Sequence, residues 1–273
     1  MLVSNCLIVR DEERDIAEWL AYQHVLGFDV VYVYDHMSTD RTAEIVRKVA
    51  RHQDVRLISW DHPSSGRTQL ISYQHCHENL GEGIDWCFFT DADEFFVPHG
   101  CDDVKTFLGR FADAAAVAVN WAVYGSDGHA DLPSCLVIEA FRRRADPRSL
   151  TACHLAKSFV RPETAQRASF GHYSDVEGLY VDSAGRPVQW VKPGKTAFPP
   201  DYAGGQLNHY LTRSRAHWAK RLSRGQLTTH SRSWEDFERY DRNEILDESA
   251  IRFAPLVRRQ LERYGLELEH VLA

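Results

Sequence analysis

Short apolar runs alternate with amphipathic segments through the first 90 residues. Four runs rich in β-branched and aromatic side chains predict strands: residues 2–9, 29–35, 55–60 and 84–90. The three segments between them carry apolar residues at helical spacing and predict helices: 11–27, 38–50 and 68–81. Helices of this length between apolar strands indicate parallel strand pairing, so we expect an α/β fold with a largely parallel sheet covered on both faces.

The second half of the chain is less regular. Residues 114–125 and 154–162 predict two further strands, and residues 171–205 are rich in Gly, Pro, Asp and Tyr and predict loops with short strands. Residues 204–225 predict a strand followed by a basic helix. The pattern of residues 233–264 is helical, with a break or kink expected at Pro255.

Composition limits the classes of protein to consider. The chain has 273 residues and is 44% apolar, enough for one large domain or two small ones. A net charge of −7 argues against a protein held to nucleic acid by phosphate contacts. No stretch approaches the roughly 18 to 20 apolar residues of a membrane span, and the N-terminus lacks the features of a secretory signal. Together with six cysteines in no C-x-x-C pair, this predicts a cytoplasmic protein with reduced thiols.

Acidic side chains follow two of the predicted strands. Asp91, Asp93 and Glu94 come directly after the apolar run WCFF, and Asp35 ends the second strand. A polar loop capping a buried strand is one explanation. The other is a site for Mg²⁺ or Mn²⁺, which take carboxylate oxygens from the protein and diphosphate oxygens from a ligand. Because open α/β sheets bind ligands at the carboxyl ends of their strands, two acidic strand ends favour a site.

Five sequence blocks occur in a recognisable order: VRDEERDIAEWLAYQHVLGFDVVYVYDHMSTDRT, WCFFTDADEFFVP, NWAVYGSDGH, KSFVRP and LNHYLTRS. In this order they resemble glycosyltransferase family 92 and its bacterial family-2-like relatives, over about residues 5–225. The resemblance implies a single GT-A-type domain at 1–225, with a nucleotide-sugar-binding half (1–100) and an acceptor half (101–225). A C-terminal helical extension at 226–273 would pack on it.

The resemblance also implies an activity, namely an inverting transfer of a sugar from a UDP-sugar, with Mn²⁺ or Mg²⁺, to a hydroxyl of a glycan or lipid-linked acceptor. By the family's D-x-D motif, Asp93 would bind the metal and Asp91 would hold the ribose or a metal-bound water. Glu94 would be a structural acid behind them. His209, in LNHY, matches the distant His that often completes such a metal site, although a buried hydrogen-bonded His is an equal alternative.

Further donor contacts are expected by resemblance. Asp35 matches the acid that hydrogen-bonds uracil, with an Asp-initiated turn as its alternative. The segment VRDE stands where family members usually have KNE, so Arg10 and Glu12 are expected near the diphosphate and Asp11 adds a negative charge there. Arg67 and Lys157 could offset the diphosphate charge, although each alone could be a solvated or ion-paired residue.

The acceptor side offers less specific signals. Trp121, Tyr124 and His172 could stack on or hydrogen-bond an acceptor sugar, or could belong to the core. A single displacement needs a general base, for which Glu139 and Asp127 are the candidates. Their alternatives are an acid paired with the arginines at 142–144 and a turn residue. The basic helix after LNHY could touch an anionic membrane at its inner face, or simply be solvated.

Two other functions use a similar sheet. A sugar-nucleotide pyrophosphorylase or phosphodiesterase is one, but the first loop, LIVRDEERD, lacks the glycines that a pyrophosphorylase needs there. A binding module that has lost catalysis is the other, and the presence of Asp91, Asp93 and His209 together argues against it.

Overall fold

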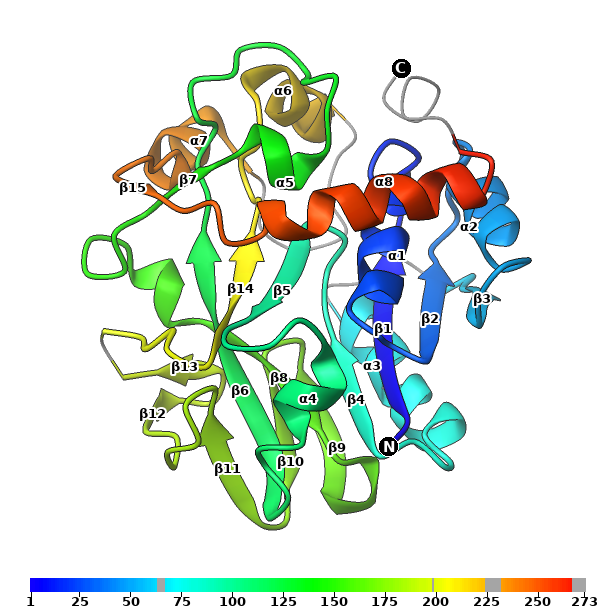
Figure 1. The fold of residues 1–273 in the computed structure, drawn as a ribbon, viewed down its shortest axis with the longest axis vertical. Coiled ribbons are helices and arrows are strands. Elements are labelled where there is room, and N and C mark those ends of the chain that lie inside the picture. The colour runs from blue at the N-terminus through cyan, green and yellow to red at the C-terminus, as the bar shows by residue number, and fades with distance from the viewer. Residues whose placement is uncertain (63–66, 198, 224–231, 267–273) are drawn as a thin grey trace.

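The computed structural model describes residues 1–62, 67–197, 199–223 and 232–266. Within these residues the main feature is a nine-stranded sheet with the strand order β3-β2-β1-β4-β8-β6-β14-β5 and with β11 beside β6 (Figure 1). Its strands are β1 Val3–Val9, β2 Val30–Asp35, β3 Val55–Ser59, β4 Trp86–Phe89, β5 Glu94–Pro98, β6 Ala114–Val123, β8 Ala156–Val160, β11 Leu179–Asp182 and β14 Gly205–His209.

Most of the pairing in this sheet is parallel, as the sequence predicted. Neighbours among β3, β2, β1 and β4 are all parallel, and β6 is parallel to both β14 and β11. The antiparallel pairings are those that β8 makes with β4 and β6, and that β5 makes with β14. The predicted α/β architecture with a largely parallel central sheet is therefore confirmed.

Helices cover both faces of the sheet. The helices α1 (Ile16–Val25), α2 (Thr42–Val49) and α8 (Ala254–Arg263) lie on the front face in Figure 1, and α3 (Thr68–Leu80) lies behind the sheet. Along β2, Val31 and Val33 belong to the core under α1, whereas Tyr32 and Tyr34 belong to the core under α3. Burial on both faces explains why this strand is apolar throughout rather than alternating.

Smaller elements surround the central layers. The other α-helices in the described residues are α4 Val104–Leu108, α5 Val137–Ala140, α6 Arg215–Ser223 and α7 Trp234–Tyr240. Three short antiparallel pairs join β9 (Ala165–Phe170) to β10 (Tyr173–Val176), β12 (Trp190–Lys192) to β13 (Lys195–Thr196), and β7 (Arg143–Arg144) to β15 (Ile245–Leu246). Among the described residues, no helix has the length and apolarity required to cross a bilayer.

The first two helices begin later than predicted. Residues 11–15 form a loop that is fastened to residues 38–42: the backbone N–H of Asp11 donates to Ser38 Oγ (3.0 Å), and that of Glu12 donates to Thr42 Oγ1 (2.7 Å). Asp40 Oδ1 in turn accepts from the backbone N–H of Thr42 (2.9 Å), at the start of α2. These contacts between separate segments hold residues 11–15 outside the helix. The spacing of apolar residues along the sequence cannot predict such contacts.

The C-terminal stretch differs from the prediction of one kinked helix. Between α7 and α8 the chain forms the short strand β15 and then a 3₁₀ turn, Ile251–Phe253, rather than a helix that continues α7. Pro255 lies in the first turn of α8, where its missing N–H has no intrahelical partner to lose, so it starts this helix instead of breaking it. The side chains of Val257 and Leu261 are buried against the main core, so α8 is continuous with the packing of the sheet.

Candidate active site

The acidic turn between β4 and β5 is held by Glu94, the first residue of β5. Its carboxylate is fully buried and accepts hydrogen bonds from the backbone N–H of Asp91 (2.8 Å) and from Trp121 Nε1 (2.7 Å). Burial raises the pKa of Glu94 well above its usual value, although Lys157 opposes this. The turn that carries Asp91 and Asp93 is thus held in place by a hydrogen bond to Glu94 on β5, a strand that the sequence did not predict.

Lys157 brings a positive charge to this turn from β8. Its side chain is only 1% exposed, and its Nζ lies 3.1 Å from Asp91 Oδ2 and 3.6 Å from Glu94 Oε2. Burial alone would lower the pKa of Lys157, but the two carboxylates raise it, so it is an ammonium ion at neutral pH. The other oxygen of Asp91 accepts hydrogen bonds from Gln69 and Tyr73 of α3.

His209 reaches Asp93 because β14 is inserted between β5 and β6. In the strand register His209 is the partner of Glu94 on β5, which places the imidazole beside the acidic turn. His209 Nε2 lies 3.5 Å from Asp93 Oδ1, and Arg221 of α6 donates to Asp93 Oδ2 (2.9 Å). Burial would raise the pKa of Asp93, but His209 and Arg221 together hold it well below its usual value.

Asp93 and His209 could supply two ligands to a small hard cation. Both side chains are largely buried, and His209 Nε2 lies 3.5 Å from Asp93 Oδ1, so the two atoms face each other. Asp91 is turned toward Lys157 and α3 instead, and no group of three His, Cys, Asp or Glu side chains in the described ranges is spaced to hold a metal. A cation at Asp93 and His209 would therefore need further ligands from a bound diphosphate or from water.

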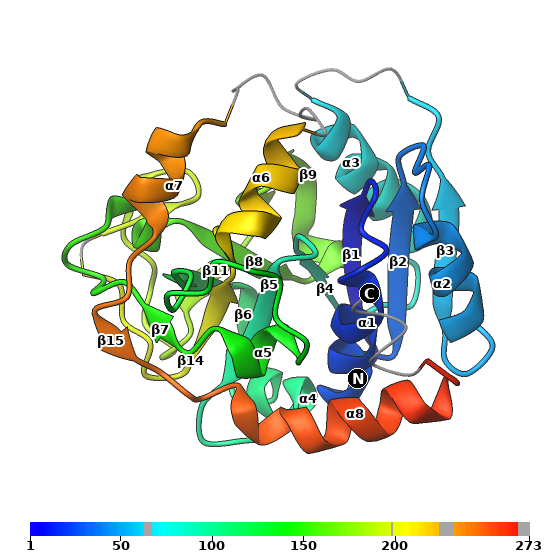
Figure 2. The same ribbon diagram turned by 90° about the horizontal axis from the view of Figure 1, so that it is seen from above.

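The loops after β1 and β2 lie together at the same edge of the sheet. Asp11 accepts from the backbone N–H of Thr39 (2.7 Å), and Arg10 lies 3.8 Å from Asp11. Asp35 Oδ1 accepts from the backbone N–H of Ser38 (3.2 Å), as an Asp-initiated turn requires. In Figure 2 the arrowheads of β1 and β2 point toward the side of the molecule where α3 and α6 lie. Arg10, Glu12 and Asp35 thus come from adjacent loops.

Arg67 occupies the position just before α3 and is exposed. It borders residues 63–66, which lie outside the described ranges. Its predicted contact with a diphosphate stays a prediction.

The aromatic candidates for acceptor binding divide into two groups. The Trp121 ring packs on His209 (centroids 4.1 Å apart) and on His172 (4.8 Å), so these three rings form one cluster beside the acidic turn. Burial, with a contribution from Lys157, lowers the pKa of His172 to about 3, so it is uncharged at neutral pH. Tyr124 is only 1% exposed and its hydroxyl donates to the carbonyl of Asp247 (3.2 Å), which makes it a core residue.

The two candidate bases are both engaged with arginines. Glu139 in α5 forms an ion pair with Arg258 of α8, and it also accepts from the backbone N–H of Leu136 (3.2 Å). Asp127 accepts from the backbone N–H of Arg142 (3.2 Å), and its Oδ1 lies 3.6 Å from Arg143. Either carboxylate would have to weaken its ion pair in order to accept a proton from an acceptor.

Comparison of the sequence with models of known protein families shows which family the chain belongs to. The model of glycosyltransferase family 92 matches residues 4–243. The chain belongs to glycosyltransferase family 92. The resemblance that the five sequence blocks predicted is confirmed.

The curated family 92 relatives are distant and longer. A glycosyltransferase family 92 protein of Oryza sativa subsp. japonica is 22% identical over 241 residues, which cover 85% of this chain and 37% of the relative. One from Ricinus communis is 26% identical over 170 residues, covering 58% of this chain and 28% of the relative. The chain therefore spans about a third of the length of these relatives.

Solved structures show weaker similarity to this family 92 chain. Residues 1–349 of TarS from S. aureus align with a TM-score of 0.38 and 18% identity, covering 59% of this chain and 47% of that one. Glucosyl-3-phosphoglycerate synthase from Mycobacterium tuberculosis, in complex with Mn²⁺, uridine diphosphate and phosphoglyceric acid, aligns with a TM-score of 0.30 and 18% identity, covering 44% and 43%. Similarities at this level identify neither a ligand nor a chemistry for this chain.

Arg221 is the residue of this family 92 site that sequence reasoning missed. It lies in the basic helix α6, which the sequence suggested to be solvated or in contact with a membrane. Its Nη1 instead donates to both Asp93 Oδ2 and the carbonyl of Leu211 (2.9 Å each). Only the excess of basic residues directly after LNHY pointed to it, because nothing in the spacing shows which side of α6 faces the acidic turn.

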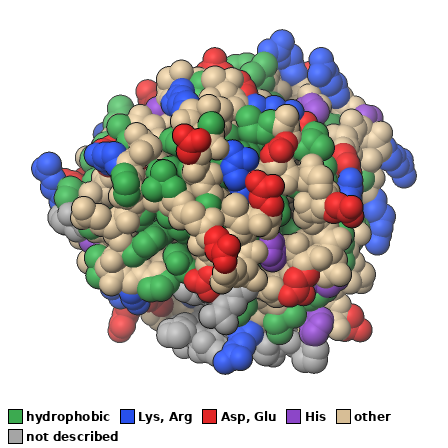
Figure 3. Space-filling view, turned by 90° about the horizontal axis from the view of Figure 1, so that it is seen from below, with side chains coloured by type: hydrophobic (Ala, Val, Ile, Leu, Met, Phe, Trp, Pro, Cys, Tyr) green, Lys and Arg blue, Asp and Glu red, His purple; other side chains and the backbone are tan. Residues whose placement is uncertain are grey.

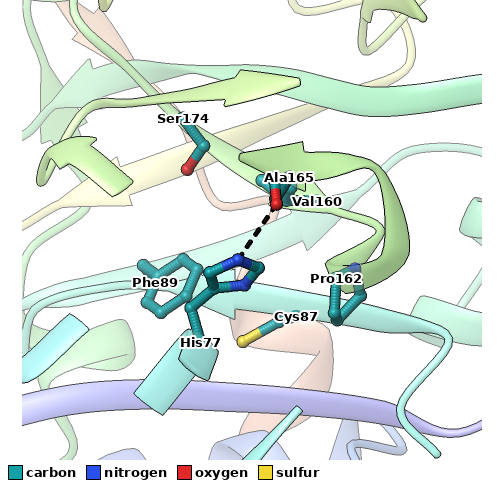
Figure 4. Close-up of a pocket in the computed structure, with 7 residues that line it drawn as sticks. All are labelled: His77, Cys87, Phe89, Val160, Pro162, Ala165 and Ser174. Atoms are coloured by element: carbon teal, nitrogen blue, oxygen red, sulfur yellow. Dashed lines mark hydrogen bonds between the residues drawn. The ribbon is translucent and has the colours of Figure 1, made fainter. Parts of the chain in front are cut away.

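Other surfaces of the chain do not involve the predicted site residues. A small pocket on the α3 side of β4 is lined by His77, Cys87, Phe89, Val160, Pro162, Ala165 and Ser174, and His77 Nε2 lies 3.0 Å from the carbonyl oxygen of Ala165 (Figure 4). On the face seen from below, acidic side chains lie across the middle and most basic ones lie toward the rim (Figure 3). In its described part, this face lacks the basic stripe typical of nucleic-acid binding.

Proposed function

We propose that this chain transfers a sugar from a nucleotide-sugar donor, a UDP-sugar, to a hydroxyl of a glycan or lipid-linked acceptor. The observation that carries the proposal is the convergence of Asp91, Asp93, Lys157 and His209 at one edge of the sheet. They come from three separate segments, namely the acidic turn, β8 and β14, and Asp93, Lys157 and His209 are all buried. Membership in glycosyltransferase family 92 supports the reaction class.

The donor would lie along the carboxyl ends of β1, β2 and β4. In this arrangement Asp35 accepts a hydrogen bond from the uracil ring, while Arg10 and Arg67 offset the diphosphate charge and Glu12 helps to shape the first loop. Lys157 already carries its charge beside Asp91, so the positive charge needed near a leaving diphosphate is present before the donor binds.

A divalent cation, Mn²⁺ or Mg²⁺, would bind through Asp93 Oδ1 and His209 Nε2, with Asp91 assisting through water. When bound, such a cation stabilises the negative charge that develops on the departing diphosphate. Arg221 holds the second oxygen of Asp93 and fixes the orientation of this carboxylate.

The transfer would be a single displacement with inversion at the anomeric carbon. The acceptor hydroxyl attacks, its proton passes to a carboxylate on the acceptor side, and the nucleoside diphosphate leaves. Glu139 and Asp127 are the candidate bases because both lie after β6, away from the acidic turn. The cluster of Trp121 and His172 offers one apolar surface for a sugar ring.

We further propose that the reaction takes place in the cytoplasm. The exposed Lys220 on α6 would suit a peripheral contact with anionic lipid headgroups if the acceptor is lipid-linked.

Release of the nucleoside diphosphate tests the proposed function. The chain is incubated with UDP-glucose, UDP-galactose and their N-acetyl derivatives in the presence of Mn²⁺, and slow UDP release without acceptor is measured. We expect release by the wild type and by Asp102→Asn, a matched control at an exposed acid, but not by Asp93→Asn. Equal release by Asp93→Asn, or no release from any donor by the wild type, would contradict the proposal.

A further inference from the structure

A second pocket lies where the loop before α1 meets the segment before α6. Its polar walls are Arg14, Asp15, Arg213 and His217, and its apolar wall includes Leu132 and Phe141. The first loop, the segment after β6 and the chain after β14 all contribute to it, and these three segments also carry predicted donor or acceptor residues.

Arg213 is the unusual residue of this pocket. It is 3% exposed, and its Nη1 forms an ion pair with Asp15, but its Nε has no hydrogen-bond partner among the described residues. Its backbone adopts φ 49°, in the left-handed region that few non-glycine residues occupy. A buried N–H without an acceptor is costly, and so is this backbone conformation, which indicates that something other than stability keeps Arg213 there.

The pocket carries more positive than negative charge. Arg14 and Arg213 both line it, whereas Asp15 is the single carboxylate on its walls. Arg14 Nη2 donates to the carbonyl of Pro133 (2.6 Å), another residue that lines the pocket. The nearby Glu18 is turned away, because its carboxylate accepts from the backbone N–H groups of Val137 (2.7 Å) and Ile138 (3.3 Å).

The remaining walls suit a sugar ring. Leu132, Pro133 and Phe141 provide apolar surface in the same pocket as the arginines, which fits the apolar face of a pyranose whose charged substituent contacts the guanidinium groups. Arg213 lies four residues after His209, on a segment bound to the acidic turn, because the backbone N–H of Tyr210 donates to the carbonyl of Asp93 (2.9 Å). A ring bound here would therefore be next to the proposed donor.

We propose that this pocket is the acceptor subsite and that it recognises an oxyanion on the acceptor, either the carboxylate of an acidic sugar or the phosphate of a phosphosugar. This inference rests on the proposed function. An oxyanion at this position would accept from Arg14 and lie beside the buried guanidinium of Arg213, and it would neutralise the excess charge of the pocket.

Ligand-observed saturation-transfer NMR on the full chain tests the inference with three probes: methyl β-D-glucuronide, glucose 6-phosphate and the neutral methyl β-D-glucoside. We expect one of the two anionic sugars to bind at least roughly tenfold more tightly than the neutral one. If methyl β-D-glucuronide binds, the pocket recognises a carboxylate; if glucose 6-phosphate binds, it recognises a phosphate. Arg14→Gln, at a partly exposed position, should remove this preference, whereas Arg56→Gln on the exposed edge of β3 should keep it.

UDP binding, measured in parallel by calorimetry, separates this inference from the proposed function. UDP binding without any preference for an anionic sugar would overturn the inference and leave the proposed function standing. Preference for an anionic sugar without UDP binding would support the pocket as an oxyanion site and count against the proposed function. An unchanged preference in Arg14→Gln would also overturn the assignment.

Discussion

Glu18 provides a test of how the structure around α5 is stabilised. This glutamate of α1 is 2% exposed, and it accepts hydrogen bonds from the backbone N–H groups of Val137 and Ile138 at the start of α5. Burial raises the pKa of Glu18 from 4.5 to about 7, and the two backbone hydrogen bonds only partly oppose this. The substitution Glu18→Gln removes the charge and keeps one of the two oxygens that accept from the backbone, so it resembles the protonated glutamic acid.

The sign and size of the effect follow from linkage. The folded protein binds this proton more tightly than the unfolded chain, so the cost of ionising Glu18 is absent below about pH 4.5, grows between pH 4.5 and 7, and is complete above pH 7. At about 1.36 kcal/mol for each pKa unit, the full cost is about 3 kcal/mol. Glu18→Gln should therefore raise the free energy of unfolding by about 2 to 3 kcal/mol at pH 8 and by almost nothing near pH 4.5.

Urea unfolding followed by tryptophan fluorescence at pH 5, 6, 7 and 8 measures this difference. The exposed Glu82 supplies the matched control, and Glu82→Gln should show no gain that grows with pH. If Glu18→Gln were less stable than the wild type at pH 8, the carboxylate would be favourable in its charged form, and the reasoning about its burial would be refuted.

Three further predictions concern the site itself. Asp35→Ala should weaken UDP binding by about 1 to 3 kcal/mol in calorimetry; intact UDP binding with a lower melting temperature would show that Asp35 only closes its turn. Glu139→Gln should keep UDP-sugar binding and lower transfer about a hundredfold or more; normal turnover, with Asp127→Asn inactive, would move the base to Asp127. Trp121→Phe removes the 2.7 Å hydrogen bond to the buried Glu94 carboxylate and should lower the free energy of unfolding by about 1.5 to 3 kcal/mol; unchanged stability would contradict the importance of this bond.

Most strands of the first half could be predicted because β1, β2 and β4 are buried on both faces. The runs VVYVY (30–34) and WCFF (86–89) contain no charged residue, and the apolar side chains on both faces of these strands belong to the core. The start of α1 could not be predicted, since Asp11 and Glu12 are held outside the helix by Ser38 and Thr42, residues of another segment.

The acidic turn shows the same division between local and long-range causes. The position of Asp91 and Asp93 at the end of β4 follows from the sequence pattern. The strand β5 does not, because an acid begins it, and Glu94 can be buried there only with Lys157 and Trp121 beside it. Arg221 lies 128 residues from Asp93 in the sequence, and the contact between them depends on how α6 leaves β14.

The account depends most directly on donor binding at Asp93 and His209. Calorimetric titration of UDP into the wild type, Asp93→Asn and His209→Gln, each with Mn²⁺ and with EDTA, measures it. We expect Mn²⁺ to tighten UDP binding to the wild type, and both variants to lose at least roughly tenfold in affinity and most of their response to the metal. UDP affinity that is the same in all three proteins, with or without Mn²⁺, would contradict the assignment of this edge of the sheet as a metal-assisted donor site.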